Sequence, residues 1–221
     1  MKKTILILSL VTLTSCQTQN ISKEDKSKVI NKLEDLMTVD QKYAGIPSNE
    51  LIEKYGNEKA WEIFKNKRDS IATVNQLIVK KIFNKYGFIG ENNFNKSASN
   101  NFWLIVQHAD NDIKLQKKVL KVMYKETKNN NASKINYAML EDRVNVNNGK
   151  KQKFGSQVTY NKIGQAIPVN GLIDSLNIEK IRAEFGLPSF KKYYNEMTKM
   201  HFEMNKDIYI SRGITEPKFY K

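Results

Sequence analysis

Apolar residues recur every three or four positions along most of this chain, and that spacing is typical of helices with one buried face. Between 27 and 37 the apolar stripe consists of Val29, Ile30, Leu33, Leu36 and Met37. The same spacing predicts further helices at 49–55, 58–85, 112–125, 134–146, 177–184 and 189–205. A chain with this pattern is expected to fold mainly as packed helices.

The run at 102–106 (FWLIV) is apolar on every side, so this element is expected to lie at the centre of the core. Its composition also allows a buried strand. We expect a helix, because the periodic segment at 112–125 follows after a very short joint. The polar stretch at 88–100, before the run, is predicted to be a loop.

One region breaks the helical pattern. Residues 152–160 alternate and are partly β-branched, and 165–169 can pair with them across a turn at 161–164. A length of 221 residues suits one domain. We therefore predict a mainly α fold, in which a single helical domain over 29–210 carries a small β-hairpin and an irregular tail follows at 211–221.

The N-terminus has the layout of an export signal. Two lysines precede an apolar run, Ile5–Leu13, that is too short to span a bilayer. The run ends in Leu13-Thr14-Ser15-Cys16, which resembles the lipobox of bacterial lipoproteins. The resemblance implies cleavage of a signal peptide over 1–15 and fatty acylation of Cys16, where two acyl chains give stable anchoring. The other interpretation is an ordinary secretory signal with an incidental cysteine.

A lipid on Cys16 makes the membrane a partner of this protein. It places the domain in the cell envelope on the extracytoplasmic side, either in the periplasm or at the cell surface. Residues 16–28 have almost no apolar content and are predicted to be a flexible tether between the lipid and the domain.

The charge of the chain is strongly basic, with 37 Lys and Arg residues against 23 Asp and Glu residues. All but four of these basic residues are lysines, and they are spread along the whole chain. Nucleic-acid binding would use clustered basic residues, so we read the lysines as a solvated surface and expect no nucleic-acid partner. One Cys and two His leave little for a metal site, and we expect no metal or other cofactor.

The first concentration of unusual polar residues is Gln107-His108-Ala109-Asp110, directly after the apolar run. On a helix His108 continues the buried face of Leu104, so its imidazole could be a general base or a ligand-binding group with Asp110 nearby. In the structural interpretation, His108 is a hydrogen-bonded core histidine, Asp110 caps the next helix and Asp112 lies in its first turn.

The second concentration is Asp142-Arg143, and the third is the segment from Gln152 to Gln157. In a chain so rich in lysine, the presence of Arg143 suggests a need for the planar guanidinium, which can bind an anionic ligand through two hydrogen bonds. The other interpretation is an ion pair that fixes the helix to its neighbours. Gln152 and Gln157 would face opposite sides of a regular strand, but a bulge at Gly155 would bring both amides to one face. Alternatively, both glutamines satisfy backbone groups around the hairpin.

These motifs, in this order and spacing, resemble a bacterial domain family of unknown function. Arg182 with Gly186-Leu187, Asp40-Gln41-Lys42-Tyr43 and Tyr86-Gly87-Phe88 are similar to other landmarks of that family, and the resemblance covers about 30–200. The family usually has Tyr-Gly-Thr-Gln where this chain has Phe154-Gly155-Ser156-Gln157. The resemblance implies a shared polar site and names no reaction.

Two functional hypotheses follow. In the first, the domain is a binding or interaction module whose pocket holds a polar ligand such as a peptide or glycan, with Gln107, His108, Arg143, Gln152 and Gln157 as the binding residues. In the second, it is an extracytoplasmic hydrolase or transferase with His108 as general base, Asp110 or Asp142 orienting it and Arg143 stabilising an anion. The sequence favours the first, because no nucleophile is identifiable. The second requires His108 to contact a carboxylate and to face a cleft.

Overall fold

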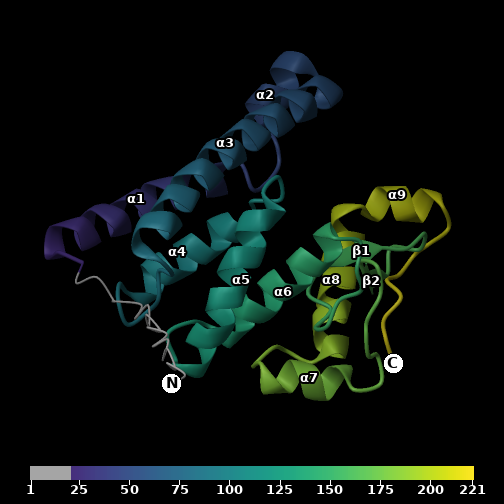
Figure 1. Ribbon diagram of the computed structural model, residues 1–221. Helices are drawn as coiled ribbons and strands as arrows, with labels where there is room; N and C mark the ends of the chain where they lie inside the picture. The colour runs from purple at the N-terminus through teal and green to yellow at the C-terminus, as the bar shows by residue number, and fades with distance from the viewer. Residues whose placement is uncertain (1–20) are drawn as a thin grey trace, which may run out of the picture.

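The computed structural model describes residues 21–221. Within them it is mainly helical, with nine helices and one two-stranded antiparallel sheet, which confirms the predicted fold class (Figure 1). The elements, in chain order, are α1 (Lys23–Lys42), α2 (Asn49–Tyr55), α3 (Asn57–Tyr86), α4 (Lys96–Gln107), α5 (Ile113–Lys128), α6 (Lys134–Asn147), β1 (Val158–Tyr160), β2 (Ala166–Pro168), α7 (Ile178–Glu184), α8 (Phe190–Met204) and α9 (Lys206–Ser211).

The core lies among α1, α3, α4, α5 and α6. As expected from its composition, α4 is at the centre, with Phe102, Ile105 and Val106 almost fully buried. Helix α4 packs against α1, α3, α5 and α6. Helix α2 contains no buried residue and packs on the outer half of α3, where the two helices project from the rest of the fold (Figure 1).

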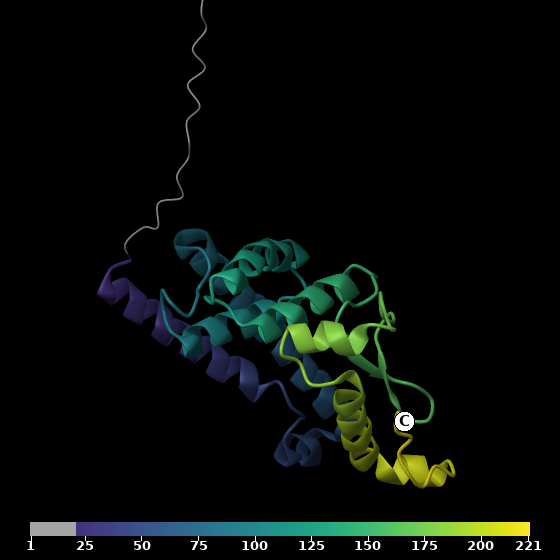
Figure 2. The same cartoon turned by 90° about the horizontal axis from the view of Figure 1, so that it is seen from below.

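The C-terminal third packs beside α6, as the view from below shows (Figure 2). In the predicted hairpin, Val158 pairs with Pro168 and Tyr160 with Ala166. Helix α8 lies against β2, where the Thr198 hydroxyl accepts a hydrogen bond from the Ala166 N–H at 3.0 Å. The tail after α9 is irregular and returns to this layer, where the Tyr220 hydroxyl donates to the Ala166 carbonyl at 2.7 Å.

Two helices begin well before their predicted boundaries. Helix α1 begins at Lys23, so the last part of the segment predicted as a flexible tether is helical. The helix begins there because the Ser22 hydroxyl caps it, accepting a hydrogen bond from the Asp25 N–H. Helix α4 begins inside the predicted loop at 88–100, where Asn95 supplies the cap. The signal peptide, Cys16 and the start of the tether lie outside the described residues.

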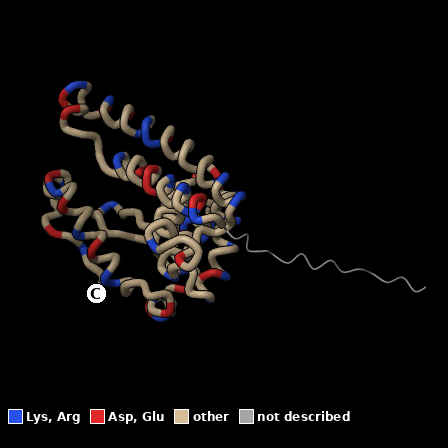
Figure 3. The backbone as a smooth tube through the Cα atoms, turned by 90° about the vertical axis from the view of Figure 1, so that its left-hand side faces the viewer, with Lys and Arg blue, Asp and Glu red and all other residues tan. Residues whose placement is uncertain are grey.

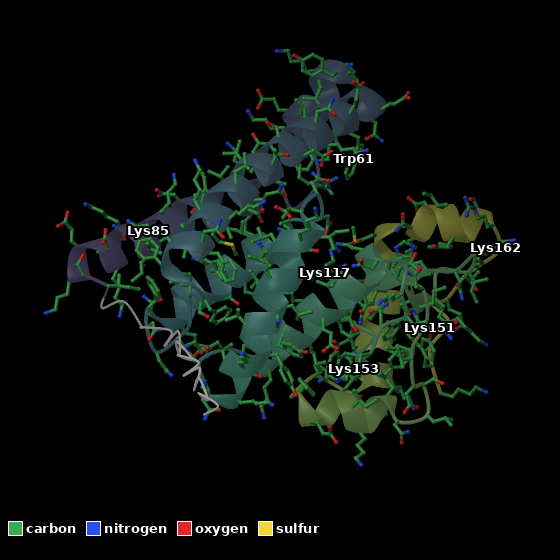
Figure 4. All side chains as sticks on the ribbon, viewed as in Figure 1. Trp61, Lys85, Lys117, Lys151, Lys153 and Lys162 are labelled. Atoms are coloured by element: carbon green, nitrogen blue, oxygen red, sulfur yellow. The ribbon has the colours of Figure 1, made fainter. Side chains whose placement is uncertain are left out.

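Lysine and arginine residues are spread along the described chain and are interspersed with acidic residues (Figure 3). The labelled lysines in Figure 4 illustrate this spread, since they come from α3, α5, the loop after α6 and the hairpin turn. None of the helices in the described part combines the length and apolar character needed to cross a bilayer.

Candidate functional site

The candidate site is a hollow of about 530 Å³ at the C-terminal end of α1. Helices α1, α3 and α6 and the joint between α4 and α5 contribute to its wall. The lining residues are Asp40, Tyr43, Ala44, Arg68, Asp69, Ala72, His108, Asp110, Asn111 and Arg143. Three of the four residues proposed from the sequence as catalytic candidates therefore meet in one place, namely His108, Asp110 and Arg143.

His108 stands at the end of α4, where its N–H donates to the Leu104 carbonyl at 3.0 Å. Its Nδ1 lies 2.9 Å from Oδ2 of Asp40, and its side chain is 35% exposed. With Asp40 accepting a hydrogen bond from Nδ1, the neutral imidazole carries its proton on Nδ1. The Nε2 lone pair is then free to accept a proton from a bound molecule, which is what a general base requires.

Asp40 is the functional residue that the sequence reasoning missed as a site residue. It lies one turn after Leu36 on the buried stripe of α1, which also contains Val29 and Leu33. Its side chain is only 8% exposed. The Gln41 amide also donates to Asp40 Oδ2, at 3.0 Å. A carboxylate on an otherwise apolar helix stripe is a sequence signal for a buried partner, and here the partner is His108.

Asp110 and Arg143 form an ion pair on another wall of the hollow. Arg143 Nε donates to Oδ1 of Asp110 at 2.9 Å, and Nη2 donates to Oδ2, so the contact is bidentate. Asn147 donates to the same Oδ1 at 2.7 Å. Burial raises the pKa of the Asp110 carboxyl, but the hydrogen bonds from Arg143 and Asn147 outweigh it and hold the pKa below its ordinary value.

This pairing corrects two expectations for the residues around His108. Asp110 does not orient His108, because its hydrogen bonds come from Arg143, Asn147 and Gln116, while His108 Nδ1 contacts Asp40. Asp110 does not cap the next helix either: Asp112 is the cap of α5, accepting from the Leu115 N–H at 2.9 Å. The alternative that Arg143 forms an ion pair within the domain therefore describes the structure, and its third bond, from Nη1, goes to Gln157 Oε1 at 3.0 Å.

Asp142, the residue before Arg143 on α6, does not line the hollow and is fully buried. Its two oxygens accept hydrogen bonds from the backbone N–H groups of Lys153, Phe154 and Ser156 at 2.8, 3.1 and 2.8 Å. Burial raises its pKa, and these three hydrogen bonds oppose the rise. Asp142 thus fixes the loop after α6 and does not contact His108, so the expectation that it could orient the imidazole is wrong.

Buried Arg182 holds the same loop from its carbonyl side, donating to Phe154 O at 2.6 Å and to Gly155 O at 3.2 Å. Gly155 has a φ of +64°, a conformation that favours glycine. Phe154 is fully buried and packs edge-on against Phe185, so its ring belongs to the core. The landmark residues of this loop are therefore structural.

The side chains of the two glutamines of this loop bind different partners. Gln152 is fully buried, and its amide bonds only backbone groups among the described residues, including Gln157 O and Val169 O, both at 2.8 Å. It therefore does not bind ligand in the hollow, contrary to expectation. Gln157 reaches Arg143 and supports the ion pair. Gln107 is buried against α6, where its amide lies 3.4 Å from the Met139 carbonyl oxygen, and it does not line the hollow.

Arg68, on α3, is a further lining residue that the sequence analysis did not single out. It is exposed, and its Nε lies 3.7 Å from Asp69 Oδ1, which is longer than a hydrogen bond. Across the part of the chain that the structure describes, no cluster of three or more His, Cys, Asp or Glu side chains could hold a metal ion. The hollow therefore offers an Asp-supported imidazole, a neutralised ion pair and one arginine with donors available.

Comparison with known proteins adds a family and no activity. The model of a family described as "Family of unknown function (DUF6624)" matches residues 32–202, which includes every residue of the hollow. No curated protein and no solved structure matches the chain.

Proposed function

We propose that this chain, which belongs to DUF6624, a family of unknown function, is a hydrolase or transferase in which His108 is the general base. The observation that carries the proposal is the 2.9 Å contact between His108 Nδ1 and Asp40 in a hollow open to solvent. It meets both conditions set for a catalytic histidine, a carboxylate partner and access to a cleft. A buried core histidine would meet only the first.

In this proposal the nucleophile is a water molecule or the hydroxyl of a second substrate. Among the residues that the structure describes, no Ser, Thr or Cys lines the hollow, so the proposal includes no covalent intermediate on such a side chain. His108 Nε2 removes the proton as the oxygen attacks, and returns it to the leaving group as the bond to that group breaks. Asp40 is a positioning residue that stabilises the imidazolium formed between the two steps.

The test is a turnover assay with chromogenic carboxylic esters, amides and phosphomonoesters, using residues 17–221, which contain every described element. Turnover of one class above the rate without protein, with release of both products in equal amounts, is the expected result. A protein that is stabilised against heat by such compounds but converts none of them would instead be a binding module for a polar ligand, and the catalytic proposal would be wrong.

We also propose that Cys16 carries lipid and holds the domain on the extracytoplasmic face of a membrane. The basic start, short apolar run and lipobox-like tetrapeptide support this, and α1 begins only seven residues after Cys16. Cys16→Ser removes the thiol that would be acylated. Labelled palmitate is expected to enter the full-length chain and not the Cys16→Ser chain in the same bacterial host. Equal labelling of both chains would contradict the anchor.

A further inference from the structure

A second hollow of about 540 Å³ lies next to the first, between the C-terminal end of α1 and the projecting α2–α3 pair. Its lining residues are Tyr43, Leu51, Ile63, Phe64, Asn66, Lys67 and Ser70. The wall is more apolar than that of the first hollow, because Leu51, Ile63 and the ring of Phe64 contribute to it. Its polar residues lie on α3, toward solvent.

The two hollows are adjacent at Tyr43, which lines both. Tyr43 is the residue at which α1 ends, three positions after Asp40, and its ring centroid is 5.5 Å from that of Phe64. On α3, Phe64 faces the second hollow and Arg68, one turn later, faces the first. Tyr43, Phe64 and Arg68 therefore place the apolar hollow directly beside the polar one, within reach of a single elongated molecule.

The two arginines of the polar hollow differ in what they can bind. Arg143 is already engaged by Asp110 and Gln157. Arg68 donates no hydrogen bond to any residue that the structure describes, and its side chain is 46% exposed. A guanidinium with free donors is suited to a carboxylate or phosphate oxygen, and Arg68 is the group placed to bind one beside His108.

We infer that the substrate is an amphiphile, with an anionic head group against Arg68 and a linear apolar chain in the second hollow. This inference rests on the proposed function, because it assumes that the hollow containing His108 is the reaction site. It goes beyond that function in assigning the Leu51, Ile63 and Phe64 surface to the apolar part of the substrate. The bond that reacts would lie at the head-group end, beside His108.

Binding of straight-chain carboxylates from butanoate to octanoate tests the inference without requiring turnover. The protein is residues 17–221 carrying His108→Gln, titrated by NMR, with the primary alcohols of the same chain lengths as neutral-head probes. Each added methylene buried in the apolar hollow is expected to lower Kd about fourfold. Arg68→Gln is expected to weaken the carboxylates by about tenfold or more and to leave the alcohols unchanged.

Ile63→Asp places a charge in the apolar wall at a half-buried position. It should abolish the dependence of Kd on chain length from butanoate to octanoate. Leu51→Asn is the milder second variant, and the melting temperature of each variant reports its folding. A Kd that does not change with chain length, or a chain-length effect that survives both variants, would overturn the amphiphile. Chain-length-dependent binding without turnover by the wild type would overturn the catalytic proposal alone, so the two failures are distinguishable.

Discussion

His108→Gln is expected to lower kcat/KM on any substrate turned over by this protein by about 10²–10⁴-fold, the contribution typical of a general base. Glutamine keeps a polar side chain at the position but cannot accept and return a proton near neutral pH. The fold should survive, because the side chain of His108 is one-third exposed and has one hydrogen-bond partner among the described residues. Steady-state kinetics beside a thermal melt measure both quantities.

The second histidine provides the matched control. His201 lies on α8, outside the hollow. Its ring stacks on that of Tyr160, with centroids 3.6 Å apart, and its Nε2 forms a hydrogen bond with the Tyr209 hydroxyl. His201→Gln removes the same chemical group and should leave kcat/KM unchanged even if it costs some stability. If His108→Gln retains wild-type turnover, or if both variants lose activity in proportion to a loss of folded protein, His108 is not the base.

Asp142→Ala is expected to reduce the free energy of unfolding by about 3–6 kcal/mol, because three backbone N–H groups lose their acceptor. Each costs about 1–3 kcal/mol when left unpaired in the interior, and removal of the buried carboxylate offsets part of that sum. Typical domains have only about 5–15 kcal/mol in total. The melting temperature should accordingly fall by about 10 °C or more. Chemical denaturation with urea gives the free energy directly.

Asp35→Ala is the control for this variant, because it removes the same charge from an exposed position on α1. It should change stability by no more than about 0.5 kcal/mol. The free energy of unfolding of Asp142→Asn should lie between those of the two alanine variants. Its amide oxygen can still accept hydrogen bonds, but its amide nitrogen faces the remaining N–H donor. Asp142→Ala with the stability of Asp35→Ala would show that the loop does not depend on this carboxylate.

The helical part of the fold was predictable because burial of an apolar face depends on local spacing. The stripe beginning at Val29 is the buried face of α1, and the all-apolar run at 102–106 lies on the central helix α4. Boundaries were less predictable where a single cap decides them, as at Ser22 and Asn95. The hairpin was predictable from alternation and its turn residues, although each strand is only three residues long.

The site was predictable only in part, because its contacts join residues far apart in the chain. The spacing after Leu104 predicted a buried His108, but the residue stands at the end of α4 with its side chain 35% exposed. Its partner Asp40 comes from 68 positions earlier. Asp110 meets Arg143 across 33 positions, a pairing that depends on how α6 packs beside the α4–α5 joint. Gln152 and Asp142 carry the same side-chain chemistry as ligand-binding residues, and only their complete burial shows that they serve the backbone.

The position of the proton on the His108 imidazole is the most direct test of whether this side chain can act as a general base. In a long-range ¹H–¹⁵N spectrum recorded in mildly alkaline solution, the resonances of His108 are assigned by their loss in His108→Gln. We expect a neutral His108 ring with its proton on Nδ1, donated to Asp40, and an unprotonated Nε2 whose resonance shifts when a substrate analogue fills the hollow. A proton on Nε2 would rule out His108 as the general base, because the imidazole would then present no lone pair to the hollow.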